Sequence, residues 1–405
     1  MSVPAFRRVW AGATVSAAGD AASWVALVGL ALGTAHASLP LLAVLYTAPV
    51  AVGGLLAGWA LDRFDRCRLM IGDCLLRGAV FASIPLTALY ARPAAWQLYM
   101  VAAAYGLLKM VGLAGFPSLI PALVPESRLD QANALEGVSY GLASLVGAGL
   151  AGLAVATVGA TQVLALDAAS YLVMALSLWS VRGLPKLAGR TMRRLSQGAG
   201  GAPQGSGLWA VARLAATSAV LRDTTIMFAL FNIGEGALLV FLPRRAQLFG
   251  LGTGGYGYLV AASTAGELLA ALLLARIRWR APLPVSIVTA QVAAALVIVP
   301  LMVSSTAVTV AALIALGTCA APMTAWAQSL RMRLVPPEAH GRLFALLRTV
   351  MQATPPVGAV LAALVIGRGA VITVVTIAAV IGVPALVLAR DLIRTRVTGV
   401  AVGSR

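Results

Sequence analysis

The sequence predicts an all-α membrane protein whose twelve transmembrane helices form two six-helix repeats. Its 405 residues are 60% hydrophobic and only 11% charged, with a mean hydropathy of +0.93, whereas a soluble domain carries about 25% charged residues. Only helices and closed barrels span a membrane. The hydrophobic runs are long and lack strict alternation, which indicates helices.

An internal repeat divides these helices into two sets, because the same short patterns occur twice in the same order. The matched pairs are Gly19-Asp20 with Gly234-Glu235, Gly53 with Gly266, Leu123–Pro125 with Leu334–Pro336, and Gly147-Ala148 with Gly358-Ala359. We therefore expect an N-terminal six-helix bundle at 1–182 and a C-terminal bundle with a short tail at 223–405. A polar cytoplasmic linker at 183–222, which could carry a surface helix at 208–221, would join them.

The basic residues fall mainly between alternate spans, which is the positive-inside pattern of a membrane protein. The predicted spans are about 9–33, 39–61, 69–90, 95–120, 132–157, 162–181, 224–243, 255–275, 283–303, 307–329, 343–366 and 370–389. Both termini are then cytoplasmic, and the formal charge of +17 reflects topology rather than a nucleic-acid partner. The preference for arginine over lysine is typical of a GC-rich bacterial genome, so we expect a bacterial inner-membrane protein.

The turn after the second predicted span carries the most specific motif. Residues 58–68 read GWALDRFDRCR, which resembles motif A of the major facilitator superfamily, G-x-L-a-D-R-x-G-R-R-R. Asp65 stands where that family has glycine, and Cys67 where it has a basic residue. Together with twelve spans in a 6+6 repeat, the resemblance covers the whole chain and implies the fold of that family.

Further segments resemble the exporter branch of this family that includes macrolide-efflux and enterobactin-export proteins. They are FRR…S…GD within Phe6–Asp20 and LVP…QANAL within Leu123–Leu135. The run at Gly147–Gly152 resembles the antiporter motif G-P-x-x-G-G, with Ala148 in place of its proline and Ala151 in place of its first paired glycine. The resemblance implies efflux.

Charged side chains inside the predicted spans are candidates for function, because each costs about 2.5–3.5 kcal/mol at mid-helix. They are Asp20, Asp73, Arg77, Lys109, Glu136, Asp167, Glu235, Glu267 and Arg348. We expect Asp73, Glu136 and Asp167 to lie near span ends, where they reach headgroups or water. Asp73 and Arg77 are four residues apart, which favours a structural pair, although Arg77 stays among the coupling candidates.

Asp20 and Glu235 are the strongest candidates for proton or substrate handling. Each lies near the middle of its span, follows a glycine and occupies the equivalent place in its half. The resemblance implies that the first helices of the two halves face each other across a central cavity, where a carboxylate could carry a proton. The alternative is a role in packing alone. Lys109 and Arg348 are the expected counter-charges, and Glu267 is either a proton site or a partner of the nearby basic loop.

Motif A is the predicted conformational gate. The resemblance implies that the second helix packs near the start of the eleventh, where Asp62 would meet the positive end of a helix dipole. That contact would favour the closed cytoplasmic side by roughly 0.3–1 kcal/mol. For the arginines, topology alone is the alternative. The predicted gate consists of Gly58, Asp62, Arg63, Asp65, Arg66 and Arg68.

Several aromatic and amide side chains could line a substrate cavity, although most would equally suit packing or lipid contact. The candidates are Trp24, Tyr105, Phe231, Asn232 and Gln352. No phosphate-binding loop, nucleophile triad or metal-ligand spacing occurs in the sequence. We therefore expect no enzyme activity, no metal, no cofactor and no ATP-driven transport.

These observations predict a proton-coupled secondary exporter of a moderately hydrophobic small molecule, such as a drug, an antibiotic or a siderophore, that works by alternating access. Its partners would be the substrate, protons and membrane lipid, and it would act as a monomer. An importer or lipid transporter of the same fold is the first alternative. A non-transporting sensor or scaffold is the second, but paired buried carboxylates would have little purpose there.

Overall fold

The computed structural model describes residues 3–183, 217–251, 254–276, 281–334, 351 and 353–394, and all regular structure within these ranges is helical. Most of the predicted linker lies outside them. The surface helix expected at 208–221 therefore stays a prediction, except that residues 219–221 belong to α10 (Ala219–Leu248). The chain divides into two compact units.

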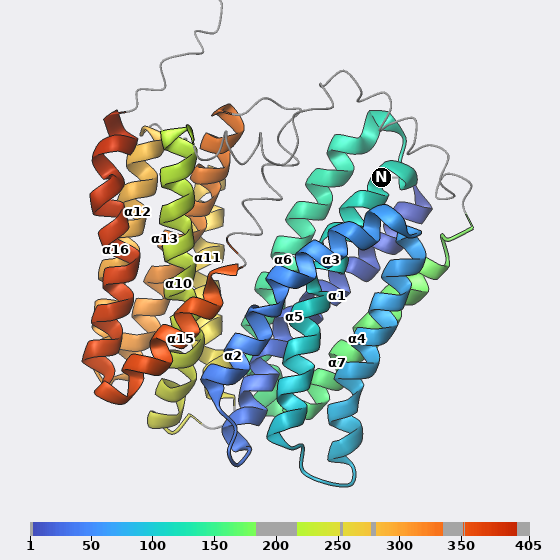
Figure 1. Cartoon of the computed structure of the whole chain (residues 1–405), viewed down its shortest axis with the longest axis horizontal. Helices are drawn as coiled ribbons and strands as arrows, with labels where there is room; N and C mark the ends of the chain where they lie inside the picture. Colours follow the sequence, from blue (N-terminus) through green and yellow to red (C-terminus); the bar gives the residue numbers. More distant parts are fainter. Residues whose placement is uncertain are drawn as a thin grey trace, which may run out of the picture. The chain divides into compact units, whose positions relative to one another are not determined.

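The first unit, residues 1–203 and 238–264, holds the first seven helices as a bundle (Figure 1). They are α1 (Pro4–Gly33), α2 (Leu39–Thr47), α3 (Pro49–Arg63), α4 (Arg66–Ala88), α5 (Ala95–Leu123), α6 (Leu129–Thr157) and α7 (Ala160–Trp179), with a 3₁₀ turn at Glu126–Arg128. α7 packs extensively against both α1 and α4. Its side chains therefore lie between two helices that carry charged residues.

The second unit, residues 204–237 and 265–405, contains parts of α10 and of α11 (Gly255–Arg276), whose other parts cluster with the first unit. Its remaining helices are α12 (Leu283–Val297), α13 (Thr306–Leu334), α15 (Pro355–Val365) and α16 (Ala370–Arg394), with 3₁₀ turns at Val299–Met302 and Ile366–Arg368. The fully buried Gln291 of α12 donates from Nε2 to the carbonyl oxygens of Met227 at 3.1 Å and Ile381 at 2.9 Å. A neutral amide thus joins three helices of this unit.

The prediction of an all-helical membrane protein is confirmed. Among the described residues, eleven helices are long and apolar enough to cross a membrane, and the apolar helix Pro355–Arg368 is shorter. The span predicted at 343–366 begins outside the described ranges. The span predicted at 39–61 is confirmed as one apolar span, Leu39–Leu61, within which the structure has two helices, α2 and α3. Pro49 starts α3 and has no N–H to continue the hydrogen-bond ladder.

Glycines make the same close helix contacts in both halves of the sequence. A Cβ at Gly53 would overlap the backbone of Leu107, and a Cβ at its repeat partner Gly266 would overlap the backbone of Ile314. Small residues allow such close approach of backbones, which is a main source of helix affinity in membranes. The two halves that repeat in sequence therefore also share this close helix–helix contact.

A second pair of glycines positions the helices that carry the two mid-span carboxylates. A Cβ at Gly147 of α6 would overlap the backbone of Ala18 on α1, and a Cβ at Gly358 of α15 would overlap the backbone of Ile233 on α10. Ala18 and Ile233 each lie two residues before the carboxylate on their own helix. Each carboxylate is thus placed beside a tight helix crossing.

We expect Gly147→Ala to destabilise the protein, because the added Cβ has no space between α6 and α1. Overpacking typically costs about 1–3 kcal/mol, so the thermal unfolding midpoint of the solubilised protein should fall. Gly141→Ala on the same helix is the control, since nothing lies within 4 Å of its added Cβ and alanine favours a helix. Equal midpoints for the two variants would contradict this role of Gly147.

A test of the membrane orientation by thiol labelling needs an exposed cysteine, and the native Cys67 is buried. The structure places Cys67 in α4 rather than in a loop, 2% exposed and with Sγ 3.5 Å from the carbonyl oxygen of Leu178. Ala91 and Ser127 are exposed and lie in loops predicted on opposite sides of the membrane.

If both termini are cytoplasmic, Ala91→Cys should react with a membrane-impermeant thiol reagent in whole cells. Ser127→Cys should react only after the cells are permeabilised. Both variants are made in a background whose native cysteines are replaced by alanine, which itself should stay unlabelled. The reverse pattern of labelling would overturn the predicted orientation.

Candidate functional site

Two helices of the first unit, α1 and α7, exchange carboxylate–hydroxyl hydrogen bonds. The hydroxyl of Tyr171 on α7 donates to Oδ1 of Asp20 on α1. In return, the hydroxyl of Ser23 on α1 donates to Oδ2 of Asp167 on α7. The spacings are three residues on α1 and four on α7, which place each pair on one helix face. We call this arrangement the α1–α7 clasp.

Gly19 allows the clasp to form. A Cβ at this position would overlap the carboxylate of Asp167 and the hydroxyl of Ser170. The missing side chain lets the Asp167 carboxylate lie against the backbone of α1. The hydroxyl of Ser170 donates to Oδ1 of Asp167 at 3.0 Å, so both oxygens of this carboxylate accept a hydrogen bond.

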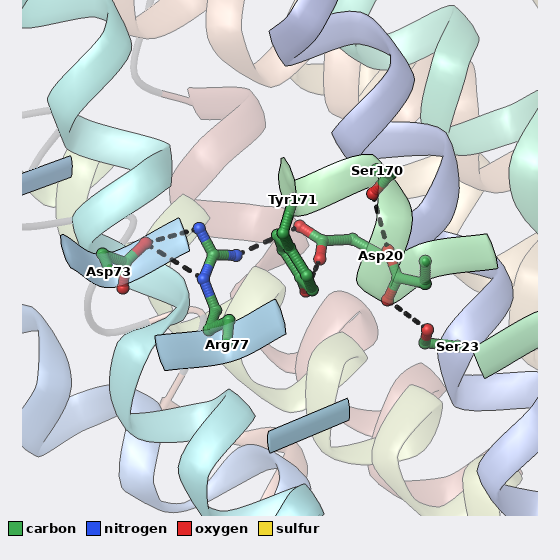
Figure 2. A network of polar contacts seen from close by, with 7 residues as sticks. Asp20, Ser23, Asp73, Arg77, Ser170 and Tyr171 are labelled. Carbon is green, nitrogen blue, oxygen red and sulfur yellow. Dashed lines mark hydrogen bonds and ion pairs between the residues drawn. The ribbon is translucent and has the colours of Figure 1, made fainter. Parts of the chain in front are cut away.

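Arg77 of α4 connects the clasp to a third carboxylate, as Figure 2 shows. Its Nε and Nη2 donate to Oδ2 of Asp73 at 3.0 Å and 2.5 Å, and its Nη1 lies 3.7 Å from Oδ2 of Asp20. The guanidinium carbon also lies 4.5 Å from the centre of the Tyr171 ring, a favourable cation–π distance. One buried cation therefore serves two carboxylates and one aromatic face.

The expectation that Asp73 and Asp167 reach headgroups or water is wrong. Their exposed fractions are 6% and 1%. Each lies seven residues past the start of its helix, about 10 Å along the axis at 1.5 Å per residue, and neighbouring helices cover it. The structural pair expected between Asp73 and Arg77 is present. A signal for Asp167 existed in the sequence, since Ser170 and Tyr171 place polar groups on the same helix face three and four residues later.

Asp20 and Arg77 open on a cavity of about 60 Å³ in the first unit. Lys109, Glu136 and Tyr140 line the same cavity, and apolar groups including Trp10, Met70, Phe116 and Met174 complete its wall. Lys109 was expected as the counter-charge of Asp20, and it lies close enough to interact electrostatically with that carboxylate. The other expected counter-charge, Arg348, lies outside the described residues.

Two predicted cavity residues, Trp24 and Tyr105, instead belong to a buried aromatic stack. The Tyr46 ring lies 4.5 Å from the Tyr105 ring and 4.6 Å from the Trp24 ring, between ring centroids. Trp24 is 8% exposed and donates from Nε1 to the hydroxyl of Tyr256, while Tyr105 is 3% exposed. The ammonium of Lys109 lies 5.8 Å from the Tyr105 ring, so the stack borders the charged cavity.

A second, larger cavity of about 540 Å³ lies in the second unit. Its wall includes two predicted cavity residues, Phe231 and Asn232, and two carboxylates, Glu235 and Glu267. Asn232 donates from Nδ2 to the carbonyl oxygen of Phe228 at 2.8 Å. Gln352, the remaining cavity candidate, lies outside the described residues.

The two mid-span carboxylates occupy the same position on equally long helices. Asp20 lies sixteen residues after Pro4 on α1, and Glu235 lies sixteen residues after Ala219 on α10; both helices contain 30 residues. Their surroundings differ, because Asp20 is bonded to Tyr171 and is near Arg77, whereas Glu235 shares its cavity with another carboxylate, Glu267. The two halves therefore place a carboxylate at the same position, but the groups around that carboxylate differ.

The motif-A turn is held mainly by Asp65 and Arg66. Asp65 caps α4, since its Oδ1 accepts a hydrogen bond from the Arg68 backbone N–H at 2.8 Å, a preferred role for aspartate. Arg66 donates to the carbonyl oxygens of Leu61 and Ser118, both at 3.2 Å, which ties the turn to α5.

Three other gate candidates, Gly58, Arg63 and Arg68, show fewer contacts among the described residues. Arg63 is exposed and lies 5.8 Å from the Trp59 ring, Arg68 is exposed, and a Cβ at Gly58 would meet nothing within 4 Å. Asp62 lies on the last turn of α3, and its side chain is outside the described part of the structure.

Comparison with known proteins gives the family. A sequence profile of the Major Facilitator Superfamily matches residues 9–353. An uncharacterized MFS-type transporter of Sinorhizobium fredii, y4rN, is 30% identical over 346 residues, which cover 82% of each protein. Macrolide efflux protein A of Streptococcus pyogenes is 25% identical over 396 residues, 90% of this chain and 89% of that one. The enterobactin exporter EntS of Shigella boydii is 31% identical over 137 residues, 33% of this chain and 31% of that one.

Solved structures share the fold at low sequence identity. A bacterial homolog of the human lysosomal transporter Spinster, in an inward-facing and occupied conformation, has a TM-score of 0.73 at 12% identity, with 98% of both chains covered. The peptide transporter POT has a TM-score of 0.71 at 15% identity, with 95% of this chain and 94% of that one covered. These likenesses show the fold alone. Because the family profile spans most of the chain, the protein belongs to the Major Facilitator Superfamily of membrane transporters.

Proposed function

We propose that the protein is a proton-coupled secondary exporter of a moderately hydrophobic small molecule. The observation that carries this proposal is Asp20, a carboxylate in the middle of a membrane span that borders a cavity and contacts both Tyr171 and Arg77. Arg77 favours the ionised carboxylate, while the Tyr171 hydroxyl can bond to either form. A group that can hold or release a proton inside the membrane is what coupling to a proton gradient requires.

The movement that couples proton and substrate would be a rocking of the two repeats about a midplane site. The repeats are the six-helix halves 1–182 and 223–405, connected by the linker 183–222. We propose that the protein acts as a monomer in the bacterial inner membrane, with both termini in the cytoplasm. The positive-inside pattern supports that orientation.

The second-unit cavity is the proposed place for the body of the substrate. Phe228 and Phe231 offer apolar surface, and Asn232, Glu235 and Glu267 add a few polar groups. An apolar pocket with a small number of polar groups is typical of small-molecule sites. Relatives named for macrolide efflux and enterobactin export support efflux as the direction.

The experiment that tests the proposal uses purified full-length protein in proteoliposomes. Erythromycin, a macrolide, and enterobactin serve as probes of the two kinds of compound that the relatives' names suggest. We expect one of them to show counterflow, and an imposed pH gradient to drive its transport against its own concentration gradient. Counterflow without any response to the pH gradient would contradict proton coupling.

We expect Asp62→Asn to lower transport while protein abundance stays near normal, because the neutral amide would interact more weakly with a helix dipole at the closed gate. Asp65→Asn in the same turn shows how much transport falls when a gate carboxylate is neutralised but the helix cap is kept, since asparagine caps helices as well as aspartate does. Initial rates of probe export are the measurement. Unchanged transport by Asp62→Asn would reduce motif A to a topology signal in this chain.

We expect Asp20→Asn to abolish export driven by a pH gradient, because asparagine cannot change protonation. It should spare substrate exchange at equal pH, which needs no net proton movement. Glu235→Gln should behave alike if the two carboxylates share the coupling, or weaken probe binding if Glu235 contacts the substrate. The measurements are gradient-driven flux and equal-pH exchange of each reconstituted variant. Loss of exchange in Asp20→Asn would instead place Asp20 in the substrate site or the packing.

A further inference from the structure

Asp167 differs from the other buried carboxylates of the first unit in its partners. Asp20 and Asp73 each form an ion pair with Arg77. Both oxygens of Asp167 accept hydrogen bonds, but the donors are the hydroxyls of Ser23 and Ser170. Among the ion pairs of the described residues, none includes Asp167. At 1% exposure its side chain is shielded from bulk solvent.

The charged groups that the structure describes around the clasp do not balance if every one of them is ionised. The helices packed here contribute Asp20 from α1, Asp73 and Arg77 from α4, Lys109 from α5, Glu136 from α6 and Asp167 from α7. The neutral titratable neighbours are Cys74, Tyr46, Tyr105, Tyr140 and Tyr171. Within the described part of the chain, four carboxylates thus accompany two cations. Buried charge without a partner is costly, and like charges in one site disfavour double ionisation.

We propose that Asp167 is a second proton-carrying residue of the coupling site and holds a proton when Asp20 is ionised. The Asp20 carboxylate is stabilised as an anion by the guanidinium of Arg77. Ser23 and Ser170 suit Asp167 in either form, because a hydroxyl can donate to a carboxylate and accept from a carboxyl group. Asp167 could therefore gain or lose its proton without breaking the clasp.

The proposal deepens the proposed function and rests on it for the role in transport. Asp20 and Asp167 interact electrostatically, so their protons are removed in steps that belong to the pair. When Asp20 takes up a proton during transport, the negative charge that disfavours ionisation of Asp167 is removed. Asp167 can then release its own proton, which makes two carboxylates, rather than one, part of the coupling.

Infrared spectroscopy of the purified full-length protein tests the protonation directly and needs no substrate. Protonated carboxyl groups absorb separately from carboxylates, and ¹³C-labelled aspartate distinguishes Asp from Glu. At neutral pH we expect a protonated-aspartate band that is lost in Asp167→Asn and kept in Asp73→Asn. Asp73 is the matched control, because it is also buried but paired with Arg77. Absence of the band, or its persistence in Asp167→Asn, would overturn the proposal.

Two further measurements keep the test decisive. If Asp167→Asn fails to fold, Ser23→Ala should shift the frequency of the same band by removing one hydrogen bond, and an unshifted band would count against Asp167. In proteoliposomes, Asp167→Asn should lose gradient-driven export of the probe and keep exchange at equal pH. If Asp167→Asn exports the probe normally while Asp20→Asn does not, the proposed role of Asp167 is wrong and the proposed proton coupling still stands. Unaltered export by both would contradict the proposed proton coupling.

Discussion

The ionic core of the first unit depends on the guanidinium of Arg77. It forms ion pairs with Asp73 on its own helix and with Asp20 on α1, and it lies over the ring of Tyr171 on α7. Three helices therefore converge on one cation at 4% exposure. Breaking a buried ion pair by removing one partner is strongly destabilising, so the geometry of the whole site follows from keeping Arg77 in place. The hydrogen bonds of the α1–α7 clasp hold Asp20 and Tyr171, which are the partners of Arg77 on those two helices.

The fold could be predicted from the sequence because its determinants are local or repeated. Hydrophobic runs of span length predict the helices, and Gly147 with Gly358 marks the same crossing twice. The site could be predicted only in part. The position of Asp20 at mid-span is sufficient to single it out, whereas Asp167 lies near the end of its predicted span, where the sequence predicts contact with headgroups or water. Burial depends on which helices cover a side chain, and that information lies in residues far away in the sequence.

The aromatic residues show the same limit. Phe231 and Trp24 are equally plausible cavity residues by type and by place in their spans. The structure lines a cavity with Phe231 and packs Trp24 against Tyr46, and no local pattern distinguishes the two. The boundary between α2 and α3, by contrast, has a local cause at Pro49, because proline lacks the N–H that a continuous helix needs.

The two halves of the chain differ in the side chains that join their helices, and Gln291 shows how far this difference goes. Duplicating a six-helix unit duplicates its helix crossings, and the glycine contacts are still present in both copies. In the second unit, the three helices α10, α12 and α16 are joined by the uncharged amide of Gln291, where the first unit relies on Arg77 and its carboxylates. The contacts of Gln291 therefore include no titratable group, whereas those of Arg77 include two carboxylates. Divergence of the two copies has therefore changed the side chains that join neighbouring helices, while the glycine crossings between helices have stayed the same.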